Sequence, residues 1–166
     1  MKKLLLAAVA AGIFATPAAA QTAANPITAA HSPVISVGLS GTLDKRCTVS
    51  AFLNGPFSEL NLENPGVQGS ESLSSKCNYP GYATLTIKSA NGGKLKSGSN
   101  ELGYTFSLSG GFATDANLSS DLVITNFHNP ANVNTDFTRS MSVKLANVAT
   151  VAGTYQDTLT ISIQPN

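Results

Sequence analysis

The stretch AGTYQDTLTISI, residues 152–163, has the clearest period-two pattern in the chain. Threonine, glutamine and serine occupy one side of it. The other side carries Tyr155, Asp157, Leu159, Ile161 and Ile163. Because successive side chains of a strand point to opposite faces, the pattern predicts a β-strand with one apolar face. We expect the strand to begin directly after the turn residue Gly153.

The same alternation recurs in short segments separated by turn residues. Residues 82–89 end at Asn91-Gly92-Gly93, and residues 101–108 end before Gly110-Gly111. Further strands are expected at residues 34–43, 47–49, 121–127 and 137–148, with a brief one at 60–62 in the turn-rich stretch 52–73. Seven or eight short strands without helical periodicity predict an all-β fold, an antiparallel immunoglobulin-like β-sandwich.

The first residues have the features of a secretory signal peptide. Lys2 and Lys3 precede an apolar run, and Ala18-Ala19-Ala20 forms a small-residue cleavage site. The run is shorter than the roughly 20 residues that span a bilayer. We expect a signal peptide at residues 1–20, a flexible leader at 21–33 and one β-sandwich domain at 34–166.

The charge of the chain excludes some classes of partner. Charged residues make up 11% of the sequence, whereas about 25% is typical. Loss of Lys2 and Lys3 with the signal peptide leaves 8 of the 10 basic residues against 9 acidic ones. A nearly neutral chain gives no electrostatic reason to expect binding to nucleic acid or anionic lipid.

No motif in the sequence indicates an enzyme. The histidines are His31 in the leader and His128, which we interpret as a solvated turn residue. Most acids fall in predicted turns, where solvated loop charges explain them: Glu59, Glu63, Glu71, Asp115, Asp121 and Asp136. Nucleophile–base pairs, phosphate loops and zinc spacings are absent from the sequence. We expect no catalytic site, no metal and no cofactor.

The two cysteines, Cys47 and Cys77, predict one disulfide, since an exported chain passes through an oxidising compartment. The chain-entropy estimate for a loop of this length is about 3.5 kcal/mol of stabilisation. A metal or redox pair is the alternative, but the wide spacing and the scarcity of histidine make a poor site.

A second amphipathic segment lies near the other end of the chain. Its alternating positions are Ile35, Val37, Leu39, Gly41 and Leu43, with glycine in place of one apolar side chain. A segment of this kind, reached through a flexible leader, suits β-strand addition to another chain. The alternative is that residues 34–43 form the first strand of their own domain.

These features together resemble two related families. Alternating residues run directly into Cys47-Thr48-Val49, the second cysteine, Cys77, is expected to open a strand in the segment CNYPGYATLTI, and the end has the form G-x-Y-x-D-x-L-x-[VI]. This resembles subunits of archaic chaperone–usher pili and the spore coat protein U family. Residues 91–149 match in strand rhythm only, and the leader is longer than the resemblance predicts.

The resemblance implies an immunoglobulin-like sandwich that lacks one strand. A periplasmic chaperone would fill the gap first, and the N-terminal donor strand of the next subunit would replace it. An outer-membrane usher and a surface fibre for adhesion or biofilm are also implied. The competing hypothesis is a self-contained secreted monomer that binds a ligand or a surface glycan.

The final strand is then expected to form the edge of the acceptor groove, with Leu159, Ile161 and Ile163 on the core. Asp157 interrupts this apolar face. Either its carboxylate accepts hydrogen bonds from backbone N–H groups or from around Tyr155, or it is solvated at the mouth of the sandwich.

Overall fold

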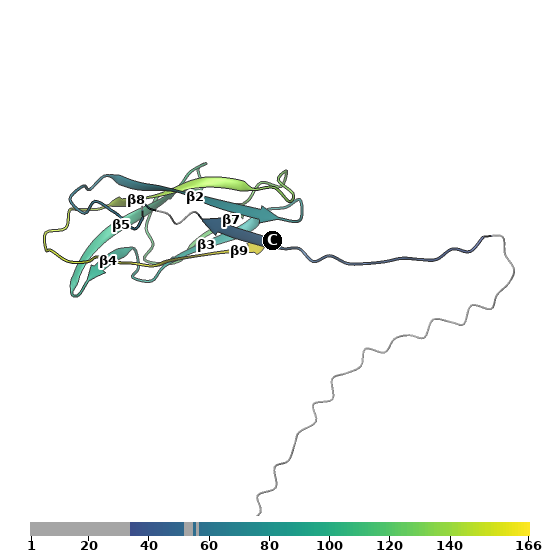
Figure 1. Ribbon diagram of the computed structural model, residues 1–166, viewed down its shortest axis with the longest axis horizontal. Coiled ribbons are helices and arrows are strands. Elements are labelled where there is room, and N and C mark those ends of the chain that lie inside the picture. Colours follow the sequence, from purple (N-terminus) through teal and green to yellow (C-terminus); the bar gives the residue numbers. More distant parts are fainter. Residues whose placement is uncertain (1–33, 52–54, 56) are drawn as a thin grey trace, which may run out of the picture. The chain divides into compact units, whose positions relative to one another are not determined.

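Nine β-strands form the part of the chain that the computed structural model describes, residues 34–51, 55 and 57–166 (Figure 1). The expected signal peptide and leader lie outside the described residues. The chain divides into a unit that ends at Gly41 and a unit of residues 42–166. The strands are β1 (Cys47–Ala51), β2 (Val67–Cys77), β3 (Ala83–Ser89), β4 (Lys94–Ser97), β5 (Asn100–Leu108), β6 (Ala113–Ala116), β7 (Leu122–Phe127), β8 (Phe137–Leu145) and β9 (Leu159–Pro165).

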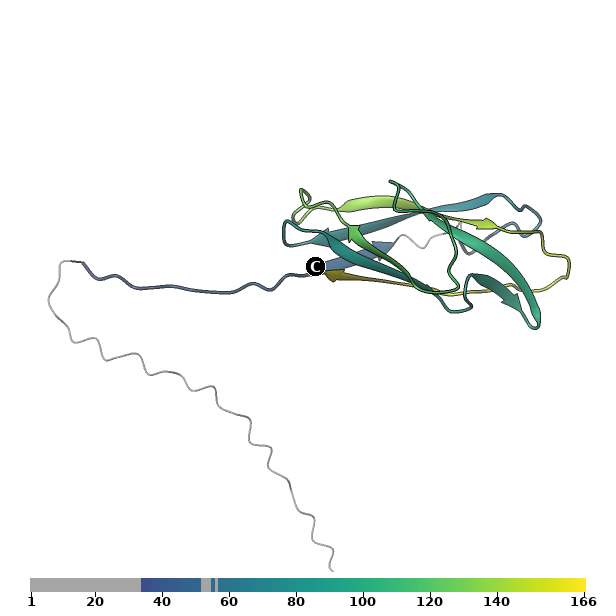
Figure 2. The ribbon, with the colours of Figure 1, turned by 180° about the vertical axis from the view of Figure 1, so that it is seen from behind.

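The strands form two antiparallel sheets that lie face to face (Figures 1 and 2). The larger sheet has the order β1-β2-β8-β5-β4, and β6 pairs with β5. The smaller sheet has the order β7-β3-β9. This arrangement, with a disulfide between Cys47 and Cys77, confirms the predicted all-β sandwich and the predicted cysteine pair.

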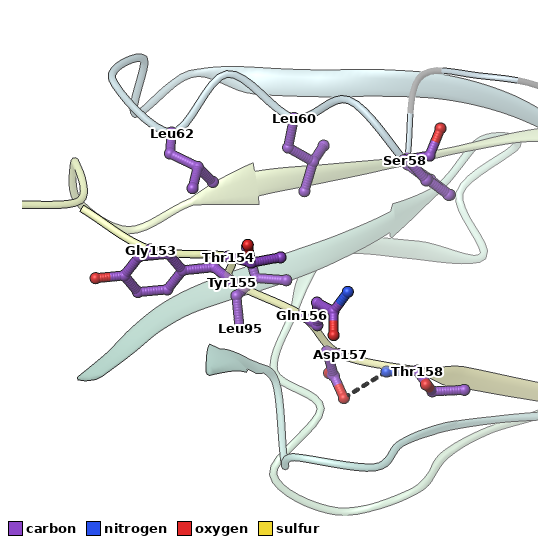
Figure 3. A pocket seen from close by; sticks show the side chains of 11 residues that line it. Ser58, Leu60, Leu62, Leu95, Gly153, Thr154, Tyr155, Gln156, Asp157 and Thr158 are labelled. Atoms are coloured by element: carbon purple, nitrogen blue, oxygen red, sulfur yellow. Dashed lines mark hydrogen bonds between the residues drawn. The ribbon is translucent and has the colours of Figure 1, made fainter. Parts of the chain in front are cut away.

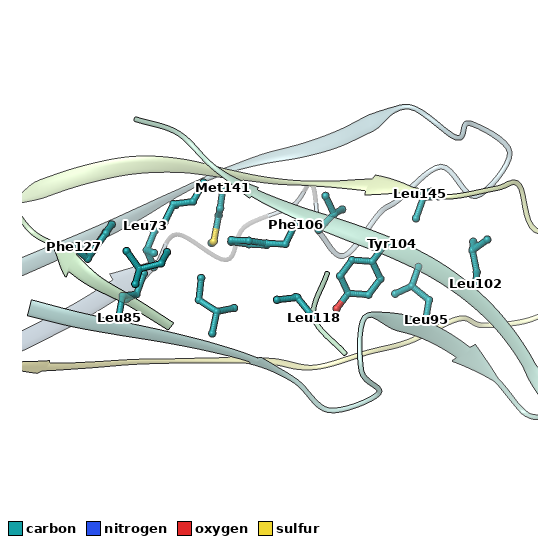
Figure 4. Close-up of a cluster of buried hydrophobic side chains, with 14 of the residues drawn as sticks. Leu73, Leu85, Leu95, Leu102, Tyr104, Phe106, Leu118, Phe127, Met141 and Leu145 are labelled. Atoms are coloured by element: carbon teal, nitrogen blue, oxygen red, sulfur yellow. The ribbon is translucent and has the colours of Figure 1, made fainter. Parts of the chain in front are cut away.

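The core fills the space between the sheets (Figure 4). Alternation in β3 buries Leu85 and Ile87 completely, as its sequence pattern predicts. In β5 the predicted face is also buried: Leu102, Tyr104, Phe106 and Leu108. Three aromatic rings, those of Phe112, Phe127 and Phe137, meet edge to face with centroids 5.1–6.0 Å apart, a preferred packing geometry.

The long strand β2 was not predicted, because its sequence VQGSESLSSKC contains few apolar residues. It lies between β1 and β8 and pairs with both. Both of its edges are therefore paired, and its inward side is buried even though serine occupies several positions: Leu73, Ser75 and Cys77 are 1% exposed. The prediction that Cys77 opens a strand is wrong, since Cys77 ends β2.

Two other strand predictions need correction. Residues 60–62 form a turn segment instead of a strand. The final strand β9 begins at Leu159 instead of directly after Gly153. Between these residues Gln156 forms an isolated bridge with Lys96 of β4, because there the chain passes along the end of the larger sheet before it enters the smaller one.

Two polar residues assigned to solvent are buried. His128 is 1% exposed; its Nδ1 lies 3.0 Å from Ser75 Oγ and its Nε2 lies 3.2 Å from the Asn132 carbonyl oxygen. Burial lowers the pKa of His128, so the neutral ring is favoured. Glu71 lies in β2 and is 5% exposed, because the turn-rich stretch that holds it in the sequence is a strand in the structure.

Candidate functional site

Two sheet edges, β1 and β9, border an open groove on one side of the sandwich. Among the described strands, β1 pairs only with β2, and β9 pairs only with β3. A hollow of about 180 Å³ lies between them, lined by Val49, Ser50, Ala51, Leu73, Leu159 and Ile161. We call this region, together with the neighbouring hollows described below, the edge groove.

Inward-facing side chains along the edge groove are only half-buried. Ile161 and Ile163 of β9 are half-exposed, whereas their ladder partners Ile87 and Leu85 in β3 are 0% exposed. On β1, Val49 is half-buried in the same way, opposite a buried serine of β2. The apolar side chains on both borders are thus partly exposed to water, and in each strand the exposed part faces the groove.

The backbone of β9 also has an unused edge. The Ala90 N–H donates to the Thr158 carbonyl, and the Asn166 N–H donates to the Tyr82 carbonyl. In an antiparallel ladder alternate residues direct both backbone groups to the same neighbour, so the even-numbered residues of β9 face β3. The N–H and C=O groups of Leu159, Ile161 and Ile163 therefore point to the edge groove.

By the same argument β1 has an unused edge. The Asn78 N–H donates to the Arg46 carbonyl, which places the even-numbered residues of β1 in hydrogen-bonded pairs with β2. The backbone groups of Cys47, Val49 and Ala51 consequently point away from β2. The groove has free hydrogen-bonding groups on two borders and apolar side chains between them.

The groove widens beyond β9. A hollow of about 630 Å³ is bordered by the turn segment 57–62 and by residues 153–158 (Figure 3). In this view Leu60 and Leu62 point toward the segment that carries Tyr155 and Asp157. A connected apolar hollow of about 260 Å³ reaches Phe57, Leu60, Leu95, Tyr104, Val143 and Leu159. Leu60 and Leu62 alternate with polar residues, but this pattern did not predict that they border a groove.

Asp157 lies at the boundary between the strand edge and the wide hollow. Its Oδ2 accepts hydrogen bonds from Ser89 Oγ at 2.6 Å and from the Tyr104 hydroxyl at 2.5 Å. Its Oδ1 accepts from the backbone N–H groups of Asn91 at 2.9 Å and Thr158 at 2.7 Å. Of the two hypotheses for Asp157, the hydrogen-bonded carboxylate matches this geometry, with Tyr104 as a partner in place of the surroundings of Tyr155.

Burial raises the pKa of Tyr104, and the hydrogen bond to Asp157 raises it further. The phenol therefore stays protonated and donates to the carboxylate. This network joins the start of β9 to the β3–β4 turn and to β5, so it holds the groove border in place. These hydrogen bonds give the Asp157 carboxylate a structural role.

Two more residues of the predicted C-terminal motif have packing roles. A Cβ at Gly153 would overlap the Ser97 hydroxyl oxygen, so the chain passes too close to β4 for a larger residue. The Tyr155 ring packs against the core, and its hydroxyl donates to the Val151 carbonyl at 3.0 Å. Both residues shape the wide end of the edge groove.

The N-terminal amphipathic segment has no strand assignment in the described structure. Its apolar side chains are exposed: Ile35 74%, Val37 74%, Leu39 93% and Leu43 78%. The space around Gly41 is open, and a side chain there would meet nothing within 4 Å other than the adjacent residues. These are the residues that the sequence analysis proposed as donor-strand positions.

Within the described residues, no group of three or more histidine, cysteine, aspartate or glutamate side chains is arranged to hold a metal ion. The same residues contain no helix with the length and apolar character of a membrane span.

No family model matches the chain, so the resemblance to spore coat protein U has no support of that kind. No curated protein matches it either. The chain is similar in fold to part of a pilus subunit structure. That structure is the CsuC–CsuE chaperone–tip adhesion subunit pre-assembly complex from archaic chaperone–usher Csu pili of Acinetobacter baumannii. The identity is 20% and the TM-score 0.42; the match covers 74% of this chain and 40% of that chain.

Proposed function

We propose that the chain is a structural subunit of a surface fibre that polymerises by donor-strand exchange. Residues 34–43 of one copy would insert into the edge groove of another copy. The inserted strand would extend the smaller sheet beyond β9 and cover the half-buried side chains of both borders.

The observation that carries this proposal is the match between an uncovered groove and an exposed apolar segment in one chain. The groove offers unused backbone groups on β1 and β9. The segment offers exposed apolar side chains at alternate positions. Each would remove from water what the other leaves exposed, and burial of apolar area contributes about 25 cal/mol per Å².

The spacing of the two partners supports an antiparallel register. Ile35 to Leu43 and Ile163 to Tyr155 each span nine residues with alternate positions inward. With Ile35 beside Ile163, Leu43 falls beside Tyr155. Gly41 then falls beside Asp157, so the donor position without a side chain meets the border position with a carboxylate.

We infer the partners from this groove and from the sequence resemblance. An exposed strand edge promotes unwanted pairing, so the groove needs cover between export and polymerisation. A periplasmic chaperone would supply that cover and an outer-membrane usher would direct assembly, as the sequence resemblance implies. We propose export into the periplasm and a final position in a fibre at the cell surface, with a role in adhesion or biofilm.

Light scattering after size-exclusion chromatography tests the proposal on residues 21–166. We expect ladders of oligomers from this chain. Leu39→Asp should give monomers with an unchanged circular dichroism spectrum, because a charge would enter an apolar groove. Ser40→Asp is the matched control, since it adds the same charge on the outward side of the segment.

The opposite results would contradict donor-strand exchange. A wild-type chain that is a stable monomer, with Leu39→Asp unfolding it, would assign residues 34–43 to the domain's own sheet. The secreted monomer that binds a ligand or surface glycan would then replace the fibre subunit as the explanation.

A further inference from the structure

The three residues between the amphipathic segment and β1 are held against the domain. The Asn78 side chain accepts a hydrogen bond from the Arg46 N–H at 2.7 Å and donates to the Asp44 carbonyl at 2.9 Å. The Lys45 ammonium donates to the Asn166 backbone oxygen at 2.7 Å and lies 4.9 Å from the centroid of the Tyr79 ring. Residues 44–46 therefore form a fixed part of the domain surface.

Salt bridges are unevenly distributed over the described structure. Lys88, Lys94, Lys96 and Lys144 each pair with an acidic residue. Lys45, Arg46 and Lys76 do not appear in any such pair within the described residues, and all three are exposed. They lie together at the disulfide end of the sandwich, where β1 begins and β2 ends. We call these three residues the basic end; Asp44 is an exposed acid beside them.

Four exposed acids, Asp44, Glu59, Glu63 and Asp136, are likewise without a cationic partner in the described structure. Asp136 directly precedes β8, at the disulfide end where Phe137 pairs with Ser75. Glu59 and Glu63 lie on or directly beside the turn segment 57–62, which borders the wide end of the edge groove. The Ala149 N–H donates to the Leu62 carbonyl at 2.9 Å, which anchors this segment. We call Glu59 and Glu63 the acidic rim.

We propose that the basic end of one copy contacts the acidic rim of the next copy, so that the fibre joint is a charged interface between two bodies. The inference rests on the proposed donor-strand exchange. In the register with Leu43 beside Tyr155, residues 44–46 emerge at the wide end of the groove, next to the acidic rim. Only three residues separate Leu43 from β1, so the two domains must meet there directly.

A charged joint of this kind accelerates association and selects the partner more than it strengthens binding. Charge reversal in K45E/R46E on residues 21–166 should slow oligomer growth about tenfold in low salt, and added salt should reduce the difference. The backbone clamp from Asn78 does not depend on these side chains. The milder pair K45Q/R46Q should give a smaller effect in the same direction.

Reciprocal reversal makes the test specific. K45E/R46E combined with E59K/E63K should restore most of the growth rate, because opposite charges meet again across the joint. The control is K88E/K144E, which reverses the same number of charges on residues that pair within their own domain. We expect this control to leave the rate within about twofold of wild type, since charges away from the interface affect association weakly.

A second measurement does not depend on rates. R46C/E63C should give disulfide-linked ladders after oxidation of the assembled protein, whereas R46C combined with D121C should not. Oligomers that form with unchanged rates in K45E/R46E and without R46C/E63C ladders would overturn the charged joint alone. A wild-type chain that stays monomeric would overturn both the joint and the proposed function.

Discussion

Ile87 and Ile161 are the same residue type and face each other in one ladder, yet their surroundings differ. Ile87 lies in the middle of the smaller sheet and is 0% exposed, whereas Ile161 lies at its edge and is half-buried. The smaller sheet therefore buries its middle strand fully but leaves the inward face of β9 partly open to water; we call these the closed and the open side. The open side consists of apolar side chains and of backbone groups that no neighbouring strand pairs with among the described residues.

The largest expected effect concerns the strand that forms the far border of the groove. Cys47→Ser removes the disulfide that fastens β1 to β2. We expect the free energy of unfolding, measured by urea denaturation, to fall by about 3.5 kcal/mol. An unchanged midpoint would mean that β1 does not need the bond to stay in place.

The two isoleucines test the comparison directly. Ile87→Ala should cost about 3 kcal/mol of unfolding free energy, as for a fully buried residue. Ile161→Ala should cost about 1 kcal/mol in the monomer, because this side chain is only partly buried there. Equal losses in urea denaturation of the Leu39→Asp monomer would break the distinction between a closed and an open side.

Asp157 holds the border between these sides. Asp157→Ala leaves the hydroxyls of Tyr104 and Ser89 without their acceptor, and we expect a loss of about 2 kcal/mol in unfolding free energy. The control Asp136→Ala alters an exposed carboxylate and should stay within about 0.5 kcal/mol of wild type. Similar values for both variants would contradict a structural role for the Asp157 network.

The smallest effect is a pH dependence on the closed side. Burial lowers the pKa of His128, so the folded state binds fewer protons at this ring than the unfolded state. The stabilising contribution is complete above the ordinary histidine pKa of about 6.5 and is lost as the pH falls below it. One proton limits the slope to about 1.4 kcal/mol per pH unit.

Denaturation of wild type and His128→Gln between pH 7.5 and 5 measures this contribution as the difference between the two curves. Because His31 and the carboxylates are common to both proteins, they cancel in that difference. A difference that does not change with pH would show that His128 is protonated equally in both states.

Alternation of apolar and polar residues predicted the elements whose inner faces consist of large side chains. Strands β3, β5 and β8 follow it closely, and so does the inward side of β9. Strand β2 was not predicted, because several of its buried positions hold serine, which is not hydrophobic. The burial of His128 was not predicted, because it depends on a contact with Ser75, a residue far away in the sequence.

The candidate site was predictable to a similar extent. The border residues Leu159, Ile161 and Ile163 could be assigned from alternation, which is a local pattern. The cysteine pair could be assigned because the sequence contains only two cysteines. The border formed by residues 57–62, the donors to Asp157 and the Asn78 clamp depend on contacts between distant segments. Such contacts leave no periodic trace in the sequence.

The most direct test of the central claim is amide hydrogen exchange on a chain that begins at Asp44, with and without a peptide of residues 34–43. We predict that the peptide slows exchange at Leu159, Ile161 and Ile163, whose N–H groups point to the groove. Thr160 and Ser162, which face β3, should change much less. A peptide carrying Leu39→Asp should have no effect. Equal protection of odd and even residues, or protection elsewhere, would contradict strand addition at the edge groove.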